Sequence, residues 1–394
     1  MIDFNEDVIS GFTTYKKEFF FCLSKYSCVH LNHIILGDVS EDFFIETCGF
    51  VTTFHVPFIK NRINSNSIIS TLLKLHITNS SNTIFIQNFS PSYEIVKMLK
   101  HAFPLCKVID VIHDFMWAAF LMGDVDKFKR IVTYKEEHKK ATFIRQLYDD
   151  NLKTFQSVDK IVCLSDDSYS LLNSFYQLDK EKLSVISNGL RDEYVSDISC
   201  VDVKGEYGIE TDCKIILYAG RVCKQKGIID VIRCFNSVVS VYPKCMLIIA
   251  GEIDSNIISC VNNNIRTRIL FLGMLTKVQL YEWYKIADIG VLPSYYEQCS
   301  YTGIEMKMFG LPIVASDGFG VNNMFTNDNA FIASIGDRND NKDYQNNLFC
   351  SLVKALNVEK TEADYYREKS REHYLAFYQS DLMAEKYIRM IEKL

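Results

Sequence analysis

Residues 293–315 read PSYYEQCSYTGIEMKMFGLPIVA, and this stretch decides the fold. An apolar run at residues 287–292 precedes it and another, at residues 313–315, ends it; both are short enough to be buried strands. The segment between the two runs predicts a loop followed by a helix. Strand, loop, helix and strand form a βαβ unit, and ligands of such units bind at the carboxyl ends of the strands.

The predicted helix begins near Thr302, has Glu305 in its first turn and ends at Gly310. The amides and the dipole at a helix N-terminus favour a bound phosphate. Glu297 and Glu305 flank this anion site. Two carboxylates would repel a bound phosphate, so we expect them to bind another part of the ligand. A carboxylate can accept two hydrogen bonds from a sugar diol. A nucleotide-sugar, which has a diphosphate between two sugars, fits this arrangement.

Each glutamate also has a structural interpretation, and the residues alone leave both open. Glu305 follows Thr302 by three residues, the spacing of an ordinary capping box. Glu297 could equally be a solvated loop residue.

Length and composition narrow the class of protein. With 394 residues, 48% of them apolar, the chain can fill two domains. We expect no membrane span and no signal peptide, because no apolar run is long enough and the first ten residues contain no base. The net charge of −6, without a basic block, argues against nucleic-acid binding.

Cysteine usage indicates a reducing compartment. The thirteen cysteines are odd in number and form no CxxC pair, and many lie inside apolar runs. We therefore expect a cytoplasmic protein. An abundance of Asn, Ile, Lys and Phe suggests a bacterial, AT-rich genome.

The first half alternates predicted strands and helices, as in a parallel, doubly wound sheet. A helix follows the turn at Ser10-Gly11, and a long charged helix is expected at residues 134–157. The expected strands are residues 2–4, 29–36, 83–87, 107–112, 160–164 and 182–187.

The same alternation restarts after a polar stretch. Strands are expected at residues 214–219, 246–250 and 269–272, with helices at 228–240 and 276–286 and a helical tail broken near 379–380. We therefore predict domains at residues 1–192 and 213–378, a linker at 193–212, and a C-terminal helix at 379–394 that returns to the first domain.

Four motifs of the second half resemble the retaining GT-B glycosyltransferases of family 4 (glycosyl transferases group 1). They are LYAGRVCKQKG (217–227), LIIAGE (247–252), ILFLGML (269–275) and ADIGVLPSYYEQCSYTGIEMKMFGLPIVAS (287–316). The first half is similar only at Gly11, IHD (112–114), LSD (164–166) and VISNGL (185–190). The resemblance implies two Rossmann-like domains facing across a cleft, with the donor on the second domain and the acceptor on the first.

The resemblance also implies roles for individual residues. Arg221 and Lys226 would neutralise the diphosphate, Glu305 would hold the ribose hydroxyls and Glu297 the donor sugar. The backbone around Met274 and Leu275 would receive the base.

His113 would lie near the sugar and the developing charge, and Gly11 is what remains of the family's first glycine loop. Residues 298–301 would line the donor sugar: Gln298, Cys299, Ser300 and Tyr301. The family usually has small or glycine-rich residues there, so the identity of the sugar stays open.

These roles predict a retaining transferase that moves a hexose or N-acetylhexosamine from a nucleotide-sugar, with UDP favoured over GDP, to a hydroxyl of a glycan, peptide or small molecule. No metal is required, because Arg221, Lys226 and the helix N-terminus supply the counter-charge. Asp124-Val125-Asp126 is better interpreted as a solvated turn than as a metal motif, and residues 337–343 do not match a calcium loop.

Two other classes of function remain open: a nucleotide-sugar epimerase or phosphorylase of the same architecture, and an inactive binding subunit. Peripheral contact with a membrane is compatible with the sequence. The oligomeric state is unknown.

Overall fold

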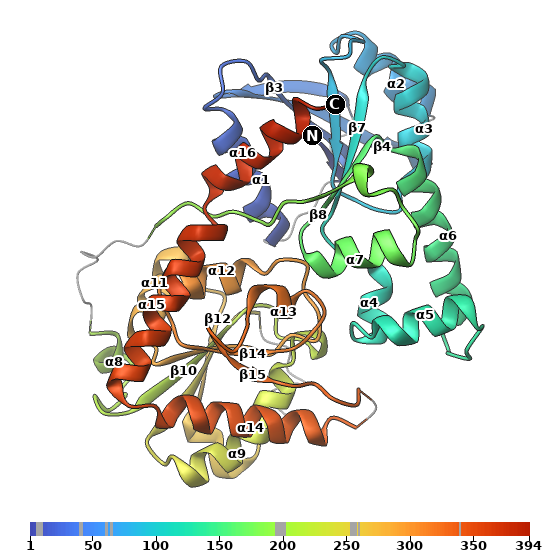
Figure 1. Cartoon of the computed structure of the whole chain (residues 1–394). Helices are drawn as coiled ribbons and strands as arrows, with labels where there is room; N and C mark the ends of the chain where they lie inside the picture. Colours follow the sequence, from blue (N-terminus) through green and yellow to red (C-terminus); the bar gives the residue numbers. More distant parts are fainter. Residues whose placement is uncertain are drawn as a thin grey trace. The chain divides into compact units, whose positions relative to one another are not determined.

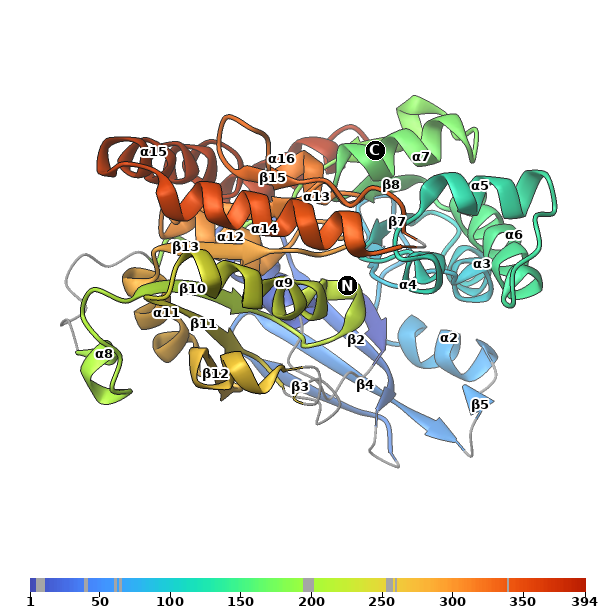
Figure 2. The same cartoon turned by 90° about the horizontal axis from the view of Figure 1, so that it is seen from below.

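The computed structural model (Figure 1; a second view in Figure 2) describes residues 1–4, 11–38, 42–59, 62–63, 66–193, 202–252, 258, 261–338 and 340–394. Ser10, where we expect the turn into the first helix, and linker residues 194–201 lie outside the described residues. The chain divides into two compact units. Unit 1 comprises Met1–Leu121, Val125–Gly189 and Ser380–Leu394, and unit 2 comprises Met122–Asp124 and Leu190–Gln379.

Unit 1 is built on a largely parallel sheet with the order β3-β4-β2-β1-β6-β7-β8-β9. Only β3 and the short β5 pair antiparallel, both with β4, among the pairings described. The strands are β1 (Ile2–Phe4), β2 (Leu31–Asp38), β3 (Phe44–Cys48), β4 (Val51–Ile59), β5 (Arg62–Ile63), β6 (Ile84–Gln87), β7 (Lys107–Ile112), β8 (Lys160–Cys163) and β9 (Leu183–Val185).

The helices of unit 1 include the end of the chain. Helix α16 packs on α1, and the hydroxyls of Tyr15 and Tyr387 are 2.9 Å apart (Figure 1). The predicted return of the last helix to the first unit is thus observed. The helices are α1 (Gly11–Leu23), α2 (Asn66–Lys74), α3 (Tyr93–Ala102), α4 (Met116–Leu121), α5 (Val125–Thr133), α6 (Ala141–Ser157), α7 (Asp166–Ser174) and α16 (Ser380–Ile391).

Two parts of unit 1 differ from the sequence-based expectation. The predicted helix at residues 134–157 is too long, since α6 begins only at Ala141 and Lys135 has a φ of +55° that no helix tolerates. Strands β3 and β4 were not predicted. Every residue of β3 is exposed, so the segment lacks the buried apolar run that marks a strand.

Unit 2 has a fully parallel sheet with the order β12-β11-β10-β13-β14-β15. The order reverses between β10 and β13, and at such a switch point the following loops diverge and leave room for a ligand. The strands are β10 (Lys214–Ala219), β11 (Cys245–Ala250), β12 (Ile269–Gly273), β13 (Ile289–Leu292), β14 (Ile313–Ser316) and β15 (Phe331–Ala333).

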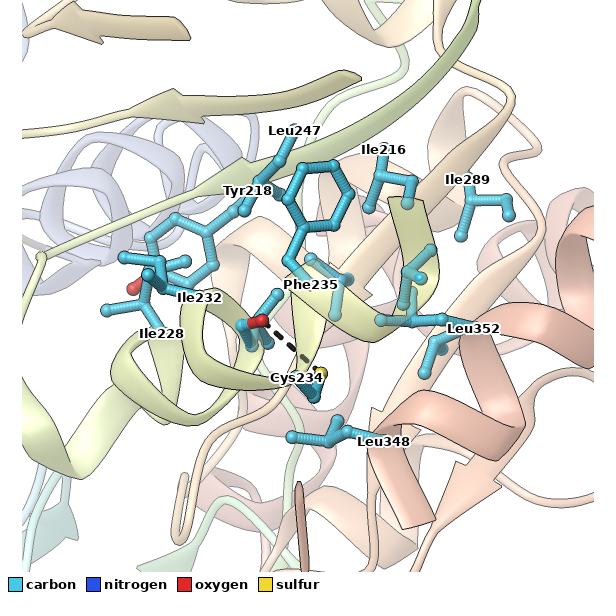
Figure 3. Packing of buried hydrophobic residues seen from close by; sticks show 14 of the residues in the cluster. Ile216, Tyr218, Ile228, Ile232, Cys234, Phe235, Leu247, Ile289, Leu348 and Leu352 are labelled. Carbon is cyan, nitrogen blue, oxygen red and sulfur yellow. Dashed lines mark hydrogen bonds between the residues drawn. The ribbon is translucent and has the colours of Figure 1, made fainter. Parts of the chain in front are cut away.

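Helices cover both faces of this sheet. On one face, α9 and α14 lie side by side; Figure 3 shows Phe235 of α9 turned toward sheet residues such as Ile216, and Leu348 of α14 beside Cys234 of α9. These side chains are almost fully buried, which gives unit 2 its own core. The helices are α8 (Val203–Glu206), α9 (Ile228–Val241), α11 (Lys277–Ile286), α12 (Tyr301–Met308), α13 (Val321–Met324), α14 (Lys342–Asn357) and α15 (Lys360–Phe377).

Candidate functional site

The loops that follow β10 and β13 meet at the switch point of unit 2. Gly227, with a φ of +69°, ends the first loop, and a Cβ atom there would lie 1.9 Å from the carbonyl oxygen of Pro293. The amide of Tyr295 donates to the carbonyl of Gln225 at 3.0 Å, and the Tyr295 hydroxyl donates to Asp230 at 2.9 Å. Backbone and side-chain contacts therefore fix the two loops against each other.

This junction brings Lys226 and Glu297 together. The Lys226 ammonium lies 2.7 Å from Oε1 of Glu297, and the hydroxyl of Ser294 donates to the same oxygen at 2.7 Å. The two side chains are 20% and 12% exposed, so the pair is largely shielded yet reachable from solvent. Glu297 is thus no freely solvated loop residue, and it lies beside the lysine expected to bind the diphosphate.

Arg221 lies on the same β10 loop, and it is exposed. Its carbonyl oxygen accepts a hydrogen bond of 2.5 Å from the hydroxyl of Tyr218, at the end of β10, which fixes the backbone from which the guanidinium extends. A tethered backbone with an exposed cation suits a residue that binds an anion from solvent.

Helix α12 begins one residue earlier than expected. Ser300 is its N-cap, and its hydroxyl accepts from the amide of Gly303 at 3.3 Å. Glu305 is therefore the fifth residue of the helix rather than part of its first turn, and the first turn contains no acidic residue. The capping-box interpretation of Thr302 and Glu305 is wrong, as is the expected place of Glu305 in the first turn.

Glu305 instead faces α11. Its carboxylate is 2% exposed, accepts a hydrogen bond of 3.1 Å from the Tyr284 hydroxyl at Oε2, and is paired at Oε1 with the Lys277 ammonium. Lys277 and Tyr284 are seven residues apart and so share one face of α11. Lys277 and Tyr284 together hold the Glu305 carboxylate in one orientation.

Met274 and Leu275 lie immediately before this helix. Met274 is 59% exposed and Leu275 is half-buried. Thr276 is the N-cap of α11 and forms a reciprocal capping box with Gln279. Because Lys277 follows directly, the segment expected to receive the base is continuous with the helix turn that contacts Glu305.

The segment from residue 298 to 301 is buried and is not a surface loop. Gln298, Cys299, Ser300 and Tyr301 are 5–8% exposed. The amide of Ser300 also contacts the sulfur of Met324 at 3.2 Å, which ties the helix start to α13.

Two predicted residues belong to unit 1. His113 follows β7, and its Nε2 donates to Oδ1 of Asn88 at 3.1 Å. The centroid of its ring lies 4.9 Å from that of Phe12 and 4.4 Å from that of Tyr15. Both of these residues lie on α1, which begins at Gly11. Burial lowers the pKa of His113 to about 3, which keeps the imidazole neutral at physiological pH.

Sequence reasoning missed the residues that support the predicted site. Ser294, Lys277 and Tyr284 contact the two glutamates, but only the fold brings the latter two close to Glu305, 28 and 21 residues away. Asp126 lies in the first turn of α5, so the Asp124-Val125-Asp126 stretch enters a helix rather than forming a turn between helices.

Within the described residues, no helix is long and apolar enough to cross a membrane. In the same part of the chain, no three His, Cys, Asp or Glu residues group as metal ligands would.

Part of the chain is similar to a known protein family and to known proteins. Residues 202–349 match the family model described as "Glycosyl transferases group 1". An uncharacterized glycosyltransferase of Methanocaldococcus jannaschii is 27% identical over 54% of this chain and 58% of its own length. N-acetyl-alpha-D-glucosaminyl L-malate synthase of Bacillus anthracis is 26% identical over 43% of this chain and 45% of its own. The chain thus spans about half the length of these curated relatives.

Solved structures match over nearly the whole chain. Sucrose-phosphate synthase of Thermosynechococcus elongatus superposes with a TM-score of 0.75 at 16% identity, covering 98% of this chain and 93% of that one. HepE of Anabaena, in complex with UDP-glucose, gives 0.68 at 12% identity, covering 100% and 98%. The fold is therefore the predicted GT-B fold.

Proposed function

We propose that this protein is a retaining glycosyltransferase that uses a nucleotide-sugar, with UDP as the favoured carrier, and requires no metal ion. The observation that carries the proposal is the arrangement of the two glutamates in unit 2. Glu297 and Glu305 each lie beside a lysine, at the switch-point loop and at the α11–α12 contact respectively.

The arrangement suits the parts of a nucleotide-sugar in order. Met274 and Leu275 would take the base and Glu305 the ribose diol. Lys226 and Arg221 would take the diphosphate, and Glu297 the donor sugar. A relative of this fold, HepE, has been crystallised with UDP-glucose, which supports UDP as the carrier.

The chemistry follows from charge. Departure of the nucleoside diphosphate builds negative charge on its terminal phosphate, and fixed cations that meet this charge stabilise the transition state. The Lys226 ammonium pairs with Glu297 at 2.7 Å. The arriving diphosphate would share this ammonium, and the Glu297 carboxylate would then accept from the donor-sugar hydroxyls. The departing phosphate oxygen can take the proton of the acceptor hydroxyl, so no separate side-chain base is needed.

His113 of unit 1 would hydrogen-bond a sugar hydroxyl. Its imidazole is neutral because burial lowers its pKa to about 3, and Asn88 fixes its ring orientation. A neutral imidazole can hydrogen-bond a sugar hydroxyl without placing a positive charge there. The transferred group would be a hexose or N-acetylhexosamine, and the acceptor a hydroxyl of a glycan, peptide or small molecule.

The proposal is tested by incubating the protein with a panel of UDP- and GDP-sugars without acceptor, with and without EDTA. Slow release of free UDP that persists in EDTA is expected from a metal-independent transferase. An epimerised nucleotide-sugar would indicate an epimerase instead. Absence of binding to every donor would indicate an inactive subunit, and loss of UDP release in EDTA would contradict metal independence.

A further inference from the structure

Helix α11 presents a row of side chains to Glu305. Lys277, Tyr281 and Tyr284 follow one another at helical spacing, and the first and last of them contact the Glu305 carboxylate. The rings of Tyr281 and Tyr284 pack on Phe309, with centroids 4.9 and 5.5 Å from its ring. This packing anchors α11 against α12, so the distance from Lys277 to Glu305 is set by rigid elements.

The two contacts differ in charge. Tyr284 is fully buried and gives a neutral hydroxyl, whereas Lys277 gives an ammonium from a side chain that is 50% exposed. Glu305 itself is only 2% exposed. A buried carboxylate is costly unless a cation and hydrogen bonds compensate it. Among the described residues, Lys277 is the cation that pairs with Glu305.

A carboxylate has more acceptor positions than these two contacts fill. Its two oxygens offer about four lone-pair directions, and contacts within the described residues use one on Oε1 and one on Oε2. The two hydroxyl donors would take the others. Lys277 and a ribose diol can therefore bind Glu305 at the same time.

We propose that Lys277 is a positioning residue of the nucleotide site: its ammonium orients the buried Glu305 carboxylate so that it can accept both hydroxyls of the nucleotide ribose. This inference rests on the proposed function, because it assumes that Glu305 binds the ribose. Lys277 acts only through Glu305. Its effect on UDP affinity requires no contact between Lys277 and the nucleotide.

The test measures UDP affinity by calorimetry for the intact protein and for Lys277→Met, Lys277→Arg, Glu305→Gln and the double variant Lys277→Met/Glu305→Gln. Lys277→Met should weaken UDP binding about fivefold or more, approaching the loss seen in Glu305→Gln. Lys277→Arg should restore most of the affinity because it keeps the charge. The double variant should bind no more weakly than Glu305→Gln alone.

Two controls separate this role from a structural one. Lys360 is likewise an exposed lysine at the first position of a helix, α15, and Lys360→Met should leave UDP affinity unchanged. The Lys277→Met effect should also vanish with 2′,3′-dideoxy-UDP, which has no diol for Glu305 to hold.

The outcomes distinguish this inference from the proposed function. If the intact protein does not bind UDP, or if Glu305→Gln binds it normally, the proposed nucleotide site is wrong. If Glu305→Gln is weakened but Lys277→Met is normal or tighter, only the role of Lys277 is overturned. A double variant much weaker than Glu305→Gln would show that Lys277 contacts the nucleotide directly, which also contradicts the proposal.

Discussion

Replacing Lys307 by methionine is expected to stabilise unit 2, and to do so more at pH 7 than at pH 9.5. Lys307 lies on α12 with no exposed surface, and its ammonium has no hydrogen-bond partner among the described residues. The ammonium lies over the ring of Phe325, whose centroid is 4.4 Å from Nζ, and this cation–π contact offsets part of the cost of burying the charge. Burial lowers the pKa of Lys307 from 10.5 to about 7.

The size and sign of the effect follow from proton linkage. The unfolded chain binds the proton with the ordinary pKa of 10.5, whereas the folded chain releases it near pH 7. Stability is therefore highest above pH 10, falls as the pH drops toward 7, and is constant below that. Each tenfold change in proton affinity corresponds to about 1.4 kcal/mol. Burying the Lys307 ammonium therefore lowers the free energy of unfolding by roughly 3 to 5 kcal/mol at pH 7 and below.

Methionine has a similar length, carries no charge and makes favourable contacts with aromatic rings. Lys307→Met should therefore gain about 3 kcal/mol or more at pH 7, and the gain should shrink to about 1 to 2 kcal/mol at pH 9.5. The matched control is Lys354→Met, because Lys354 also lies over a phenylalanine, Phe331 at 5.7 Å, but is exposed.

Urea unfolding at pH 7.0, 8.0 and 9.5 measures the effect, followed by the fluorescence of Trp283. A Trp117→Phe background leaves Trp283 as the tryptophan reporter, and Trp283 lies in unit 2. A Lys307→Met variant that is destabilised at every pH, or whose gain does not change with pH, would refute the reasoning.

Three further predictions concern unit 1, the loop after β10 and the core of unit 2. Burial raises the pKa of Asp110 to about 7, so stability is lost as the pH rises from about 4 to 7; Asp110→Asn should gain about 2 to 3 kcal/mol at pH 8 relative to pH 5, measured by thermal unfolding. Arg221→Ala and Lys226→Ala should each lower kcat of the proposed transfer at least about a hundredfold while near-ultraviolet circular dichroism stays native; normal turnover in either would place the diphosphate elsewhere. Leu348→Ala should cost unit 2 about 2 to 5 kcal/mol in urea, because it empties a fully buried position in the core of unit 2.

The sequence predicts the fold of unit 2 well because its signals are local. Strands such as β10 and β11 are buried apolar runs that end in glycine, and each predicted run lies within a residue or two of the observed strand. Unit 1 is predicted less completely. Strand β3 pairs at an exposed edge, where no alternation of buried and exposed residues marks it, and the charged segment before α6 favours helix by composition although Lys135 adopts a left-handed backbone.

Residue types and motif spacing predict which side chains belong to the candidate site but not what holds them. The spacing of Thr302 and Glu305 matches a capping box, yet Ser300 caps the helix and Glu305 packs against α11. The partners of Glu305 come from 21 and 28 residues earlier in the chain, a distance that only tertiary packing closes. Local pattern therefore identifies Glu305, and Lys277 emerges only from the structure.

The most direct test of the nucleotide site compares Glu305→Gln with Glu297→Gln, using both UDP affinity and turnover of the UDP-sugar. Glu305→Gln should weaken UDP binding by about 1 to 2 kcal/mol, or roughly 5- to 30-fold, because a neutral amide accepts from the ribose diol less strongly than a carboxylate. Glu297→Gln should leave UDP affinity nearly unchanged, since UDP carries no donor sugar, while turnover of the UDP-sugar falls. If both variants bind UDP and turn over the donor as the intact protein does, the two glutamates are structural and the proposed site is wrong.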